Sequence, residues 1–453
     1  MRKVTIIGGG GLRSPLLLYG LAQANGSLHI GEVVLFDIDQ VRTEQIARLG
    51  RTILKQVGNG FKIRTTSDLE NAADGADFVI NSVRVGGMAA RARDERIAIK
   101  HGLAGQETTG PGGAAMALRT IPVTLSHATV VESVAPKTWF INFTNPAGLI
   151  TQALLSQTGL RVIGICDTPA ELFHRIAAGL GREYRDLSFQ YAGLNHLGWI
   201  REVKLRGENI TAAILRDSAL LRTLYSSDLF DPALIETLEL IPTEYLFFYY
   251  SQRKAYENEV RAEASRGEEL DRLNQRLFEQ LRTENGSRAL AAYREYLMRR
   301  NASYMKLEGE ARSAFGVEQQ ECDPFETATG YHRIALDVMK ALVSDDAREI
   351  VVNVANRESV LGLEPDDVVE VPCDVDRTGA RARPVGQLPE SVRGLVQCVK
   401  AYERTIIRAS LCRSRALARL AMLEYPIVGQ WELAGELLDA LCASDPEGLG
   451  YLK

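Results

Sequence analysis

The stretch VTIIGGGGLR, residues 4–13, decides how the N-terminal part of this 453-residue chain folds. Its first four residues are apolar or β-branched and predict a short buried strand. Four glycines follow and can form a tight turn, and the apolar spacing of residues 14–24 predicts a helix directly after that turn. A strand, a glycine-rich turn and a helix in this order are typical of a dinucleotide-binding βαβ unit.

The second apolar run supports a dinucleotide site, because it ends at Asp37, whose carboxylate can accept hydrogen bonds from ribose hydroxyls. We expect Gly8, Gly10 and Gly11 to let backbone N–H groups approach a pyrophosphate. Arg13 stands at the third glycine position of the usual fingerprint and can meet a phosphate instead. The acid at the strand end favours NAD over NADP. The alternative is a tight turn that binds no ligand.

Further apolar runs at residues 76–82, 139–143 and 162–165 predict more strands. The residues at or just after the strand ends are Gly8, Asp37, Ser82, Asn145 and Cys166. Ligands of a parallel sheet bind beyond the carboxyl ends of its strands. We therefore predict an α/β protein with a Rossmann-like, doubly wound parallel sheet, in which residues 1–168 are an NAD-binding domain with a crevice at these ends.

The pattern changes after about residue 170, where strands such as 199–205 read as antiparallel. We predict an α+β domain at residues 169–453 that serves catalysis, substrate binding and oligomerisation. Strands are expected at residues 349–353 and 368–375, and helices at 254–281, 390–420 and 431–442. In the first domain, a polar glycine-rich loop at residues 106–113 precedes a helix expected to begin near Ala114.

Composition excludes several classes of protein. A net charge of −5 and a pI near 5.9 show no overall basic charge of the kind that binds nucleic acid. No run of about 18 apolar residues predicts a membrane span. The six cysteines include no C-x-x-C pair, which is typical of reduced thiols in a cytoplasmic protein. We expect a cytoplasmic enzyme that acts on a small molecule, with neither nucleic acid nor membrane as a partner.

Cys166, Asp167 and His196 follow apolar runs and are candidate metal ligands. A thiolate with an imidazole suits a transition metal better than magnesium or calcium. Two protein ligands would leave positions open for substrate oxygens. A nucleotide beside such a metal indicates oxidation at a carbon that bears a hydroxyl. The alternative for each side chain is a structural role in the core.

Long motifs run along nearly the whole chain: IIGGGG, RVGGM, RDERI, GQETTGPGG, ALRTIP, NFTNPAG, LNHLGW, IPxxYL, VEVP and LPExVRGLVQ. Together they resemble glycoside hydrolase family 4, most of all its 6-phospho-β-glucosidase branch. The resemblance implies a mechanism outside the usual pair of carboxylates. NAD takes hydride from C3 of the sugar, the C2 proton is removed, and the aglycone leaves C1 by elimination. Water then adds and NADH reduces C3, while manganese(II) holds the C2 and C3 oxygens.

The resemblance also implies roles for single residues. Cys166 and His196 match the family's metal ligands, and Tyr245 matches the tyrosine that removes the C2 proton. Glu107 matches a glutamate thought to raise the basicity of that tyrosine. Arg91 and Asn145 match substrate-binding positions, and Asn145 also lies where the cofactor is expected. Members are commonly homodimers or homotetramers, and we expect one of these here.

Two departures bear on the substrate. Asp167 follows Cys166 where the β branch commonly has asparagine, and Cys-Asp is more typical of 6-phospho-α-glucosidases, in which the aspartate is a general acid. Asp167 is therefore a candidate acid and substrate contact. Glu326 aligns with an arginine that contacts substrate in the branch, and a carboxylate facing the pocket would repel a phosphate. Other arginines could meet that phosphate: Arg84, Arg93, Arg312 and Arg333.

The leading hypothesis is an NAD- and metal-dependent glycosidase for 6-phospho-β-glucosides. Three enzymatic alternatives remain, namely the same chemistry on unphosphorylated β-glucosides, the same chemistry on 6-phospho-α-glucosides, and an NAD-dependent hydroxy-acid dehydrogenase. A non-enzymatic sensor of NAD or sugar phosphate is the remaining hypothesis.

Overall fold

A parallel sheet forms the N-terminal part of the protein in the computed structural model, which describes residues 1–225, 228–305, 323–327 and 329–453. Its strands are β1 (Arg2–Ile7), β2 (Ile30–Phe36), β3 (Lys62–Thr66), β4 (Phe78–Asn81), β5 (Trp139–Asn142) and β6 (Arg161–Gly164). They lie in the order β3-β2-β1-β4-β5-β6 and pair in parallel. This order, in which the chain winds outward in both directions from β1, confirms the doubly wound Rossmann-like fold.

Sequence patterns missed β3, the edge strand. Its sequence is KIRTT, and only Ile63 within it is buried. Because a polar edge strand carries almost no apolar run, the pattern that revealed the central strands is absent.

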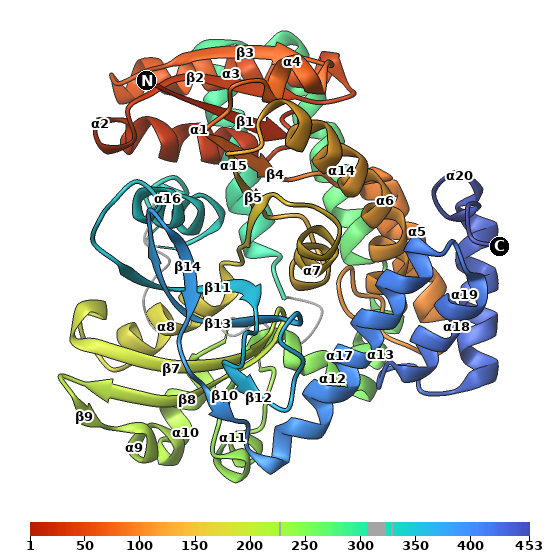
Figure 1. Ribbon diagram of the computed structural model, residues 1–453. Coiled ribbons are helices and arrows are strands. Elements are labelled where there is room, and N and C mark those ends of the chain that lie inside the picture. The colour runs from red at the N-terminus through yellow and green to blue at the C-terminus, as the bar shows by residue number, and fades with distance from the viewer. Residues whose placement is uncertain (226–227, 306–322, 328) are drawn as a thin grey trace.

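Helices cover both faces of this sheet (Figure 1). They are α1 (Ser14–Gln23), α2 (Asn25–Leu28), α3 (Gln40–Val57), α4 (Leu69–Ala73), α5 (Gly87–Lys100), α6 (Gly110–Val134), α7 (Ala147–Gln157) and α8 (Thr168–Gly179). The prediction that α6 begins near Ala114 was wrong by one turn. Gly110 has a φ of 65° and Pro111 stands in the first turn, a position that needs no N–H donor, so the helix starts within the glycine-rich loop.

The sheet continues into the second half of the chain. Its further strands are β7 (Leu187–Leu194), β8 (Leu197–Leu205), β9 (Glu208–Asn209), β10 (Ile241–Pro242), β11 (Arg348–Ala355), β13 (Val368–Asp376) and β14 (Gly379–Ala382). β11 pairs antiparallel with β6 through Asn353 and Gly164, and β7 pairs antiparallel with β8 as expected. β12 (Val360–Leu361) and β15 (Gly386–Gln387) form a separate pair. Hydrogen bonding therefore crosses the proposed boundary at residue 168, and that boundary stays a prediction.

The later helices belong to the second half of the chain. They are α9 (Thr211–Arg216), α10 (Ser218–Thr223), α11 (Pro232–Leu238), α12 (Phe247–Tyr250), α13 (Gln252–Arg261), α14 (Arg266–Thr283), α15 (Gly286–Ala302), α16 (Tyr331–Ala341), α17 (Glu390–Leu411), α18 (Arg415–Glu424), α19 (Trp431–Ser444) and α20 (Pro446–Leu449), with the 3₁₀ turns η1 (Tyr184–Asp186) and η2 (Glu244–Leu246). α14 packs on α5, α15 on α3 and α16 on α1. This packing brings the C-terminal end of α15 to the crevice.

The helix expected at residues 390–420 is in fact two helices. Arg413 adopts a left-handed φ of 55° between α17 and α18 and ends the first of them. A non-glycine residue in this conformation breaks the helical hydrogen-bond pattern, and no glycine or proline marks the break in the sequence.

Helix α6 is long and apolar enough to cross a membrane by length and composition alone. However, 61% of its apolar window is buried inside the protein, where it packs on α5, α7 and α17. Such burial is what the core helix of a globular domain shows.

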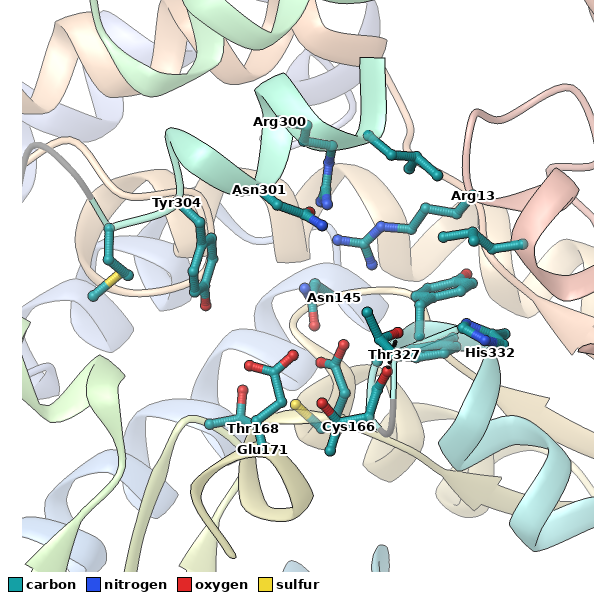
Figure 2. Close-up of a pocket in the computed structure, with 18 of the residues that line it drawn as sticks. Arg13, Asn145, Cys166, Thr168, Glu171, Arg300, Asn301, Tyr304, Thr327 and His332 are labelled. Carbon is teal, nitrogen blue, oxygen red and sulfur yellow. Dashed lines mark hydrogen bonds between the residues drawn. The ribbon is translucent and has the colours of Figure 1, made fainter. Parts of the chain in front are cut away.

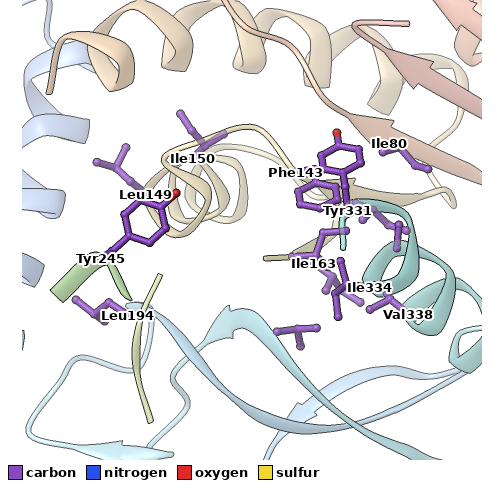
Figure 3. Packing of buried hydrophobic residues seen from close by; sticks show 14 of the residues in the cluster. Ile80, Phe143, Leu149, Ile150, Ile163, Leu194, Tyr245, Tyr331, Ile334 and Val338 are labelled. Atoms are coloured by element: carbon purple, nitrogen blue, oxygen red, sulfur yellow. The ribbon is translucent and has the colours of Figure 1, made fainter. Parts of the chain in front are cut away.

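A cluster of buried apolar side chains borders the crevice (Figure 3). Tyr331 of α16 stacks on Phe143 at a ring-centroid distance of 3.7 Å, so the two halves of the chain meet at this point. Tyr245 lies beside Leu149 and Ile150 of α7, on the other side of the same region. Close packing in this cluster therefore fixes the aromatic side chains that border the crevice.

Candidate functional site

A cavity of about 300 Å³ lies beyond the ends of β5 and β6. Asn145, Cys166, Asp167, His196 and Tyr245 all line it. The prediction that chemically capable side chains gather at these strand ends is therefore confirmed for Asn145 and Cys166. The hairpin between β7 and β8 contributes His196, and η2 contributes Tyr245.

His196 stands in the tight turn between β7 and β8 with a left-handed φ of 63°. Its neighbour Asn195 fixes this turn, because the Asn195 amide donates to Glu370 Oε1 at 3.0 Å and its oxygen accepts from the Ala147 N–H at 3.1 Å. Glu370, which is buried, also accepts bonds from Tyr191 at 2.7 Å and Asn353 at 3.0 Å. Asparagine suits such turns since its side chain bonds to nearby backbone.

The hydrogen bonds around His196 indicate its tautomer. His196 Nδ1 lies 3.0 Å from Thr108 Oγ1, and the Thr108 hydroxyl lies 2.9 Å from Gln106 Oε1, which can only accept. If the hydroxyl proton goes to Gln106, Thr108 Oγ1 accepts from Nδ1–H and Nε2 keeps a lone pair. Burial lowers the pKa of His196 to about 4, so the ring is neutral at physiological pH.

Cys166 places a thiol at the wall of the same cavity. Burial, with the charges of Glu370 and Asp167, raises its pKa well above the usual value. A nearby cation would reverse this shift, because it favours the thiolate. Within the described ranges no three His, Cys, Asp or Glu side chains come together as a metal site. The donor set of one thiol and one neutral imidazole nevertheless fits a transition metal that completes its shell with substrate oxygens.

The Tyr245 ring stacks on the His196 ring, with centroids 3.7 Å apart and planes 4° from parallel. Burial and the carboxylates of Glu107 and Glu244 raise the pKa of Tyr245 well above its ordinary value. The hydroxyl of Tyr304 lies 3.5 Å from that of Tyr245 and also donates to Glu244. Tyr245 therefore needs a strongly acidified substrate proton if it is to act as a base.

Glu107 is held between two guanidinium groups, with Arg84 at 2.5 Å and Arg91 at 2.8 Å. Burial opposes its ionisation, but the charges of Arg84 and Arg91 outweigh burial and keep its pKa well below the usual range. Arg91 in turn pairs with Glu95 at 2.7 Å. Glu107 is thus a fixed negative charge at the cavity wall rather than a proton acceptor.

The glycine turn lies where a dinucleotide would be held. Gly8 has a φ of 86°, and a Cβ there would stand 2.7 Å from the carbonyl oxygen of Ser82. The Gly10 N–H donates to Asp37 Oδ2 at 3.0 Å, which joins the turn to the end of β2. Ile38, next in the chain, is 89% exposed and offers an apolar surface beside the acid. These features fit a nucleotide, and Gly11 lies in the same turn.

Arg13 lines the cavity instead of staying at the glycine turn, and its guanidinium lies over the Tyr331 ring at 4.6 Å. Figure 2 shows Arg13 and Arg300 directed at the same space, with Asn301 between them and Asn145 below. Neither arginine has a carboxylate within ion-pairing distance among the residues that the structure describes. Two guanidinium groups that make no direct ion pair among these residues give this end of the cavity the chemistry to bind an anion.

Sequence reasoning missed several side chains of the cavity, namely Thr168, Glu171, Arg175, Arg300, Asn301 and Tyr304. A signal existed for Glu171, because it follows Asp167 by four residues on a helix that begins at Thr168-Pro169 and so lies on the same face. None existed for Arg300, because it reads as one more charge on an amphipathic helix.

Glu326 would repel a phosphate only if it faced the pocket, and it does not line the cavity. It is exposed and accepts a hydrogen bond from Tyr19. Arg84 is engaged by Glu107, and Arg93 lies 3.9 Å from Asp445. Arg333 donates to the Thr327 carbonyl at 3.0 Å. Arg312 falls outside the described residues.

Comparison with known families supports one assignment over most of the chain. Residues 3–181 match the family described as "Family 4 glycosyl hydrolase", and residues 191–428 match "Family 4 glycosyl hydrolase C-terminal domain". A probable 6-phospho-beta-glucosidase of Bacillus subtilis is 31% identical over 97% of this chain and 95% of its own. A phospho-alpha-glucosidase of Clostridium acetobutylicum is 26% identical over 97% of this chain and 96% of its own.

A solved structure supports the same assignment at the level of the fold. The 6-phospho-beta glucosidase of Thermotoga maritima, determined with manganese, NAD+ and glucose-6-phosphate, superposes with a TM-score of 0.82. The sequences are 28% identical, and the match covers 100% of both chains.

Proposed function

The chain belongs to glycosyl hydrolase family 4 and is a glycoside hydrolase, and on that premise we propose that it cleaves 6-phosphoglucosides, β-linked in the first instance, with NAD and a divalent transition metal. The observation that carries the proposal is that one cavity is lined by Cys166, His196 and Tyr245 and also by Arg13 and Arg300.

The cofactor sites follow from the donor sets. The turn of Gly8, Gly10 and Gly11 with Asp37 would hold NAD, and Cys166 with His196 would hold the metal, manganese(II) in the first instance. When bound, NAD would accept a hydride from C3 of the sugar and the metal would polarise the C2 and C3 oxygens.

The remaining steps belong to the protein's own residues. Tyr245 would take the C2 proton, since its ring is fixed against His196 and its hydroxyl stands at the cavity. Asn145 would orient the sugar between the two sites. The fixed charge of Glu107 would keep Arg91 and Arg84 in position at the wall. His196, Tyr245, Glu107 and Arg91 are buried, which limits the water around the sugar while it is oxidised.

The phosphate would lie at the end formed by Arg13, Arg300 and Asn301. A phosphate dianion is the natural partner of paired guanidinium groups, and removal of one such contact in a buried site costs 10-fold or more in binding. Arg266 supports this end, because it donates to the Arg300 backbone carbonyl at 2.9 Å.

Arg300→Ala is expected to lower kcat/KM for an aryl 6-phosphoglucoside by about 10²-fold, because it removes one charge-assisted contact. The rate with the unphosphorylated glucoside should change less than about threefold. Arg299→Ala is the matched control, since Arg299 is the preceding residue on α15 and pairs outward with Glu295 at 2.6 Å. Equal losses on both substrates would contradict a phosphate role for Arg300.

The next question is whether the enzyme cleaves α- or β-linked 6-phosphoglucosides. Relatives named for β-glucosides reach 31% identity and those named for α-glucosides 26%, which favours β. Cys166-Asp167 favours α, so 6-phospho-α-glucosides are the second candidate. A panel of aryl α- and β-glucosides, each with and without 6-phosphate, assayed with NAD and Mn²⁺, decides between them. Cleavage of the unphosphorylated compounds alone would overturn the phosphate assignment.

Thr108→Val is expected to weaken Mn²⁺ binding by about 10- to 100-fold, because the ring of His196 loses the partner that fixes its tautomer. Thr108→Ser keeps the hydroxyl and should retain most of the affinity. Titration calorimetry or the loss of the free Mn²⁺ EPR signal measures binding without reference to activity. If the valine variant bound Mn²⁺ as tightly as the wild type, Thr108 would not orient His196.

A further inference from the structure

Tyr425 lies outside the cavity, but its hydroxyl contacts two segments that carry groups of the proposed site. It accepts a hydrogen bond from the backbone N–H of Gly110 at 2.9 Å, across 315 residues of chain. It also lies 2.9 Å from the hydroxyl of Tyr249 on α12. Tyr425 is the residue directly after α18, so the C-terminal part of the chain supports both segments through one oxygen atom.

The loop at residues 106–110 has few contacts that fix it from outside. One end of it lines the reaction cavity, and its other end, including Gly110, lines a second cavity of about 300 Å³. Inside the loop, the side-chain oxygen of Gln106 accepts from two backbone N–H groups. Within the described ranges, Tyr425 is the only side chain beyond the loop that bonds to one of its N–H groups. Loss of that bond would therefore free the loop to shift.

The two segments meet again at the proposed metal ligand. Thr108, in the loop, lies 3.0 Å from His196 Nδ1. The Tyr245 ring stacks on the His196 ring at 3.7 Å. Tyr249 follows Tyr245 by one helical turn, because η2 runs directly into α12. A closed ring of contacts thus runs from Tyr425 through the loop to His196 and Tyr245, and back through Tyr249.

The Tyr425 ring is itself held by close packing. It is buried and stacks on the Tyr402 ring, with centroids 4.1 Å apart and planes 5° from parallel. Burial raises the pKa of Tyr425 to about 12, so its hydroxyl keeps its proton at physiological pH. A neutral phenol can accept from the Gly110 N–H and still share a proton with Tyr249. The oxygen is therefore suited to join the two segments.

We propose that Tyr425 is a positioning residue that holds His196 and Tyr245 in fixed positions relative to each other. This inference rests on the proposed function and deepens it. Without the Tyr425 hydroxyl, the loop can move and Thr108 no longer orients the imidazole as before. The end of α12 also loses its partner, and Tyr245 is fixed less firmly above C2. A displacement of about 1 Å at a reacting group can cost 10²-fold in rate.

Tyr425→Phe removes the hydroxyl and keeps the stack on Tyr402. Titration of the free Mn²⁺ EPR signal gives the number of sites and their affinity separately. We expect an unchanged number of sites, with affinity weakened about 3- to 10-fold. With an aryl 6-phosphoglucoside, kcat per Mn²⁺ site should fall about 10-fold while KM changes less than about twofold. A merely structural role would lower the number of folded sites without changing affinity or kcat per site.

Tyr249→Phe tests one arm of the arrangement alone, because the bond between Tyr425 and Gly110 remains. This variant should bind Mn²⁺ as the wild type does, while kcat per site falls about fivefold. In the double variant, kcat should lie within about twofold of that of Tyr425→Phe, because Tyr249 acts only through the Tyr425 oxygen. Losses that multiply in the double variant would overturn the proposal.

Tyr402→Phe is the matched control, because the Tyr402 hydroxyl makes no hydrogen bond within the described part of the chain and its ring still stacks on Tyr425. Wild-type affinity and kcat are expected for it. Equal losses in this control, or wild-type values in Tyr425→Phe, would overturn the positioning role. Mn²⁺ affinity is measured without substrate, so it tests Tyr425 even if the wild type showed no C2 exchange, a result that would contradict the proposed function.

Discussion

Replacing Tyr245 by phenylalanine is expected to lower turnover by about 10³-fold, because a general base supplies roughly 10²- to 10⁴-fold in rate. The ring stack on His196, at 3.7 Å, needs only the aromatic ring and should survive the change. Binding of substrate should therefore change little, so that kcat falls far more than KM. Steady-state kinetics with NAD and Mn²⁺, together with the rate of C2 exchange, measure the effect.

Tyr225→Phe is the matched control for this variant. Tyr225 is a buried tyrosine of the same region, and its hydroxyl donates to the Pro242 carbonyl at 2.7 Å outside the cavity. The Tyr225→Phe variant should have a lower free energy of unfolding but an unchanged rate of C2 proton removal. Retention of wild-type C2 exchange by Tyr245→Phe would show that another group removes the proton.

His196→Ala should abolish detectable Mn²⁺ binding and reduce kcat/KM by about 10³-fold, because a Lewis acid contributes several kcal/mol to stabilising charge at the reacting oxygens. In the proposed metal site His196 is one of two protein ligands, so its loss would leave Cys166 as the only one. Excess Mn²⁺ should recover only part of the rate.

The control for the metal ligand is His101→Ala, which removes an imidazole that bonds to the Ile97 carbonyl at the end of α5. This variant should bind Mn²⁺ as the wild type does. Equal Mn²⁺ affinity in His196→Ala and the wild type would exclude His196 as a ligand.

Local patterns were enough to predict the parallel sheet and its reactive edge. Gly8, Asp37, Asn145 and Cys166 each follow a buried apolar run, and the geometry of a parallel sheet then brings such ends to one edge. The edge strand β3 escaped because its sequence is polar, and the break at Arg413 escaped because a left-handed arginine has no signal in the sequence. Both failures reflect tertiary packing overriding local preference.

The cavity wall was harder to predict than its floor. Arg300 and Asn301 reach the site only because α15 packs across α3, and Thr108 meets His196 across 88 residues of chain. Contacts of this kind depend on how helices dock, which no periodicity encodes. Tyr245 was identified through the family resemblance, whereas His196 was already a candidate because it follows an apolar run. Glu171 is different, because its position one turn after Asp167 could have been noticed.

The most direct test of the proposed function is turnover of a 6-phosphoglucoside by the wild-type enzyme in D₂O with NAD and Mn²⁺. We predict that the released sugar carries deuterium at C2 and that no NADH accumulates beyond the enzyme concentration, because the hydride returns to C3 in each cycle. Released sugar without deuterium at C2, or NADH rising in step with product, would contradict it.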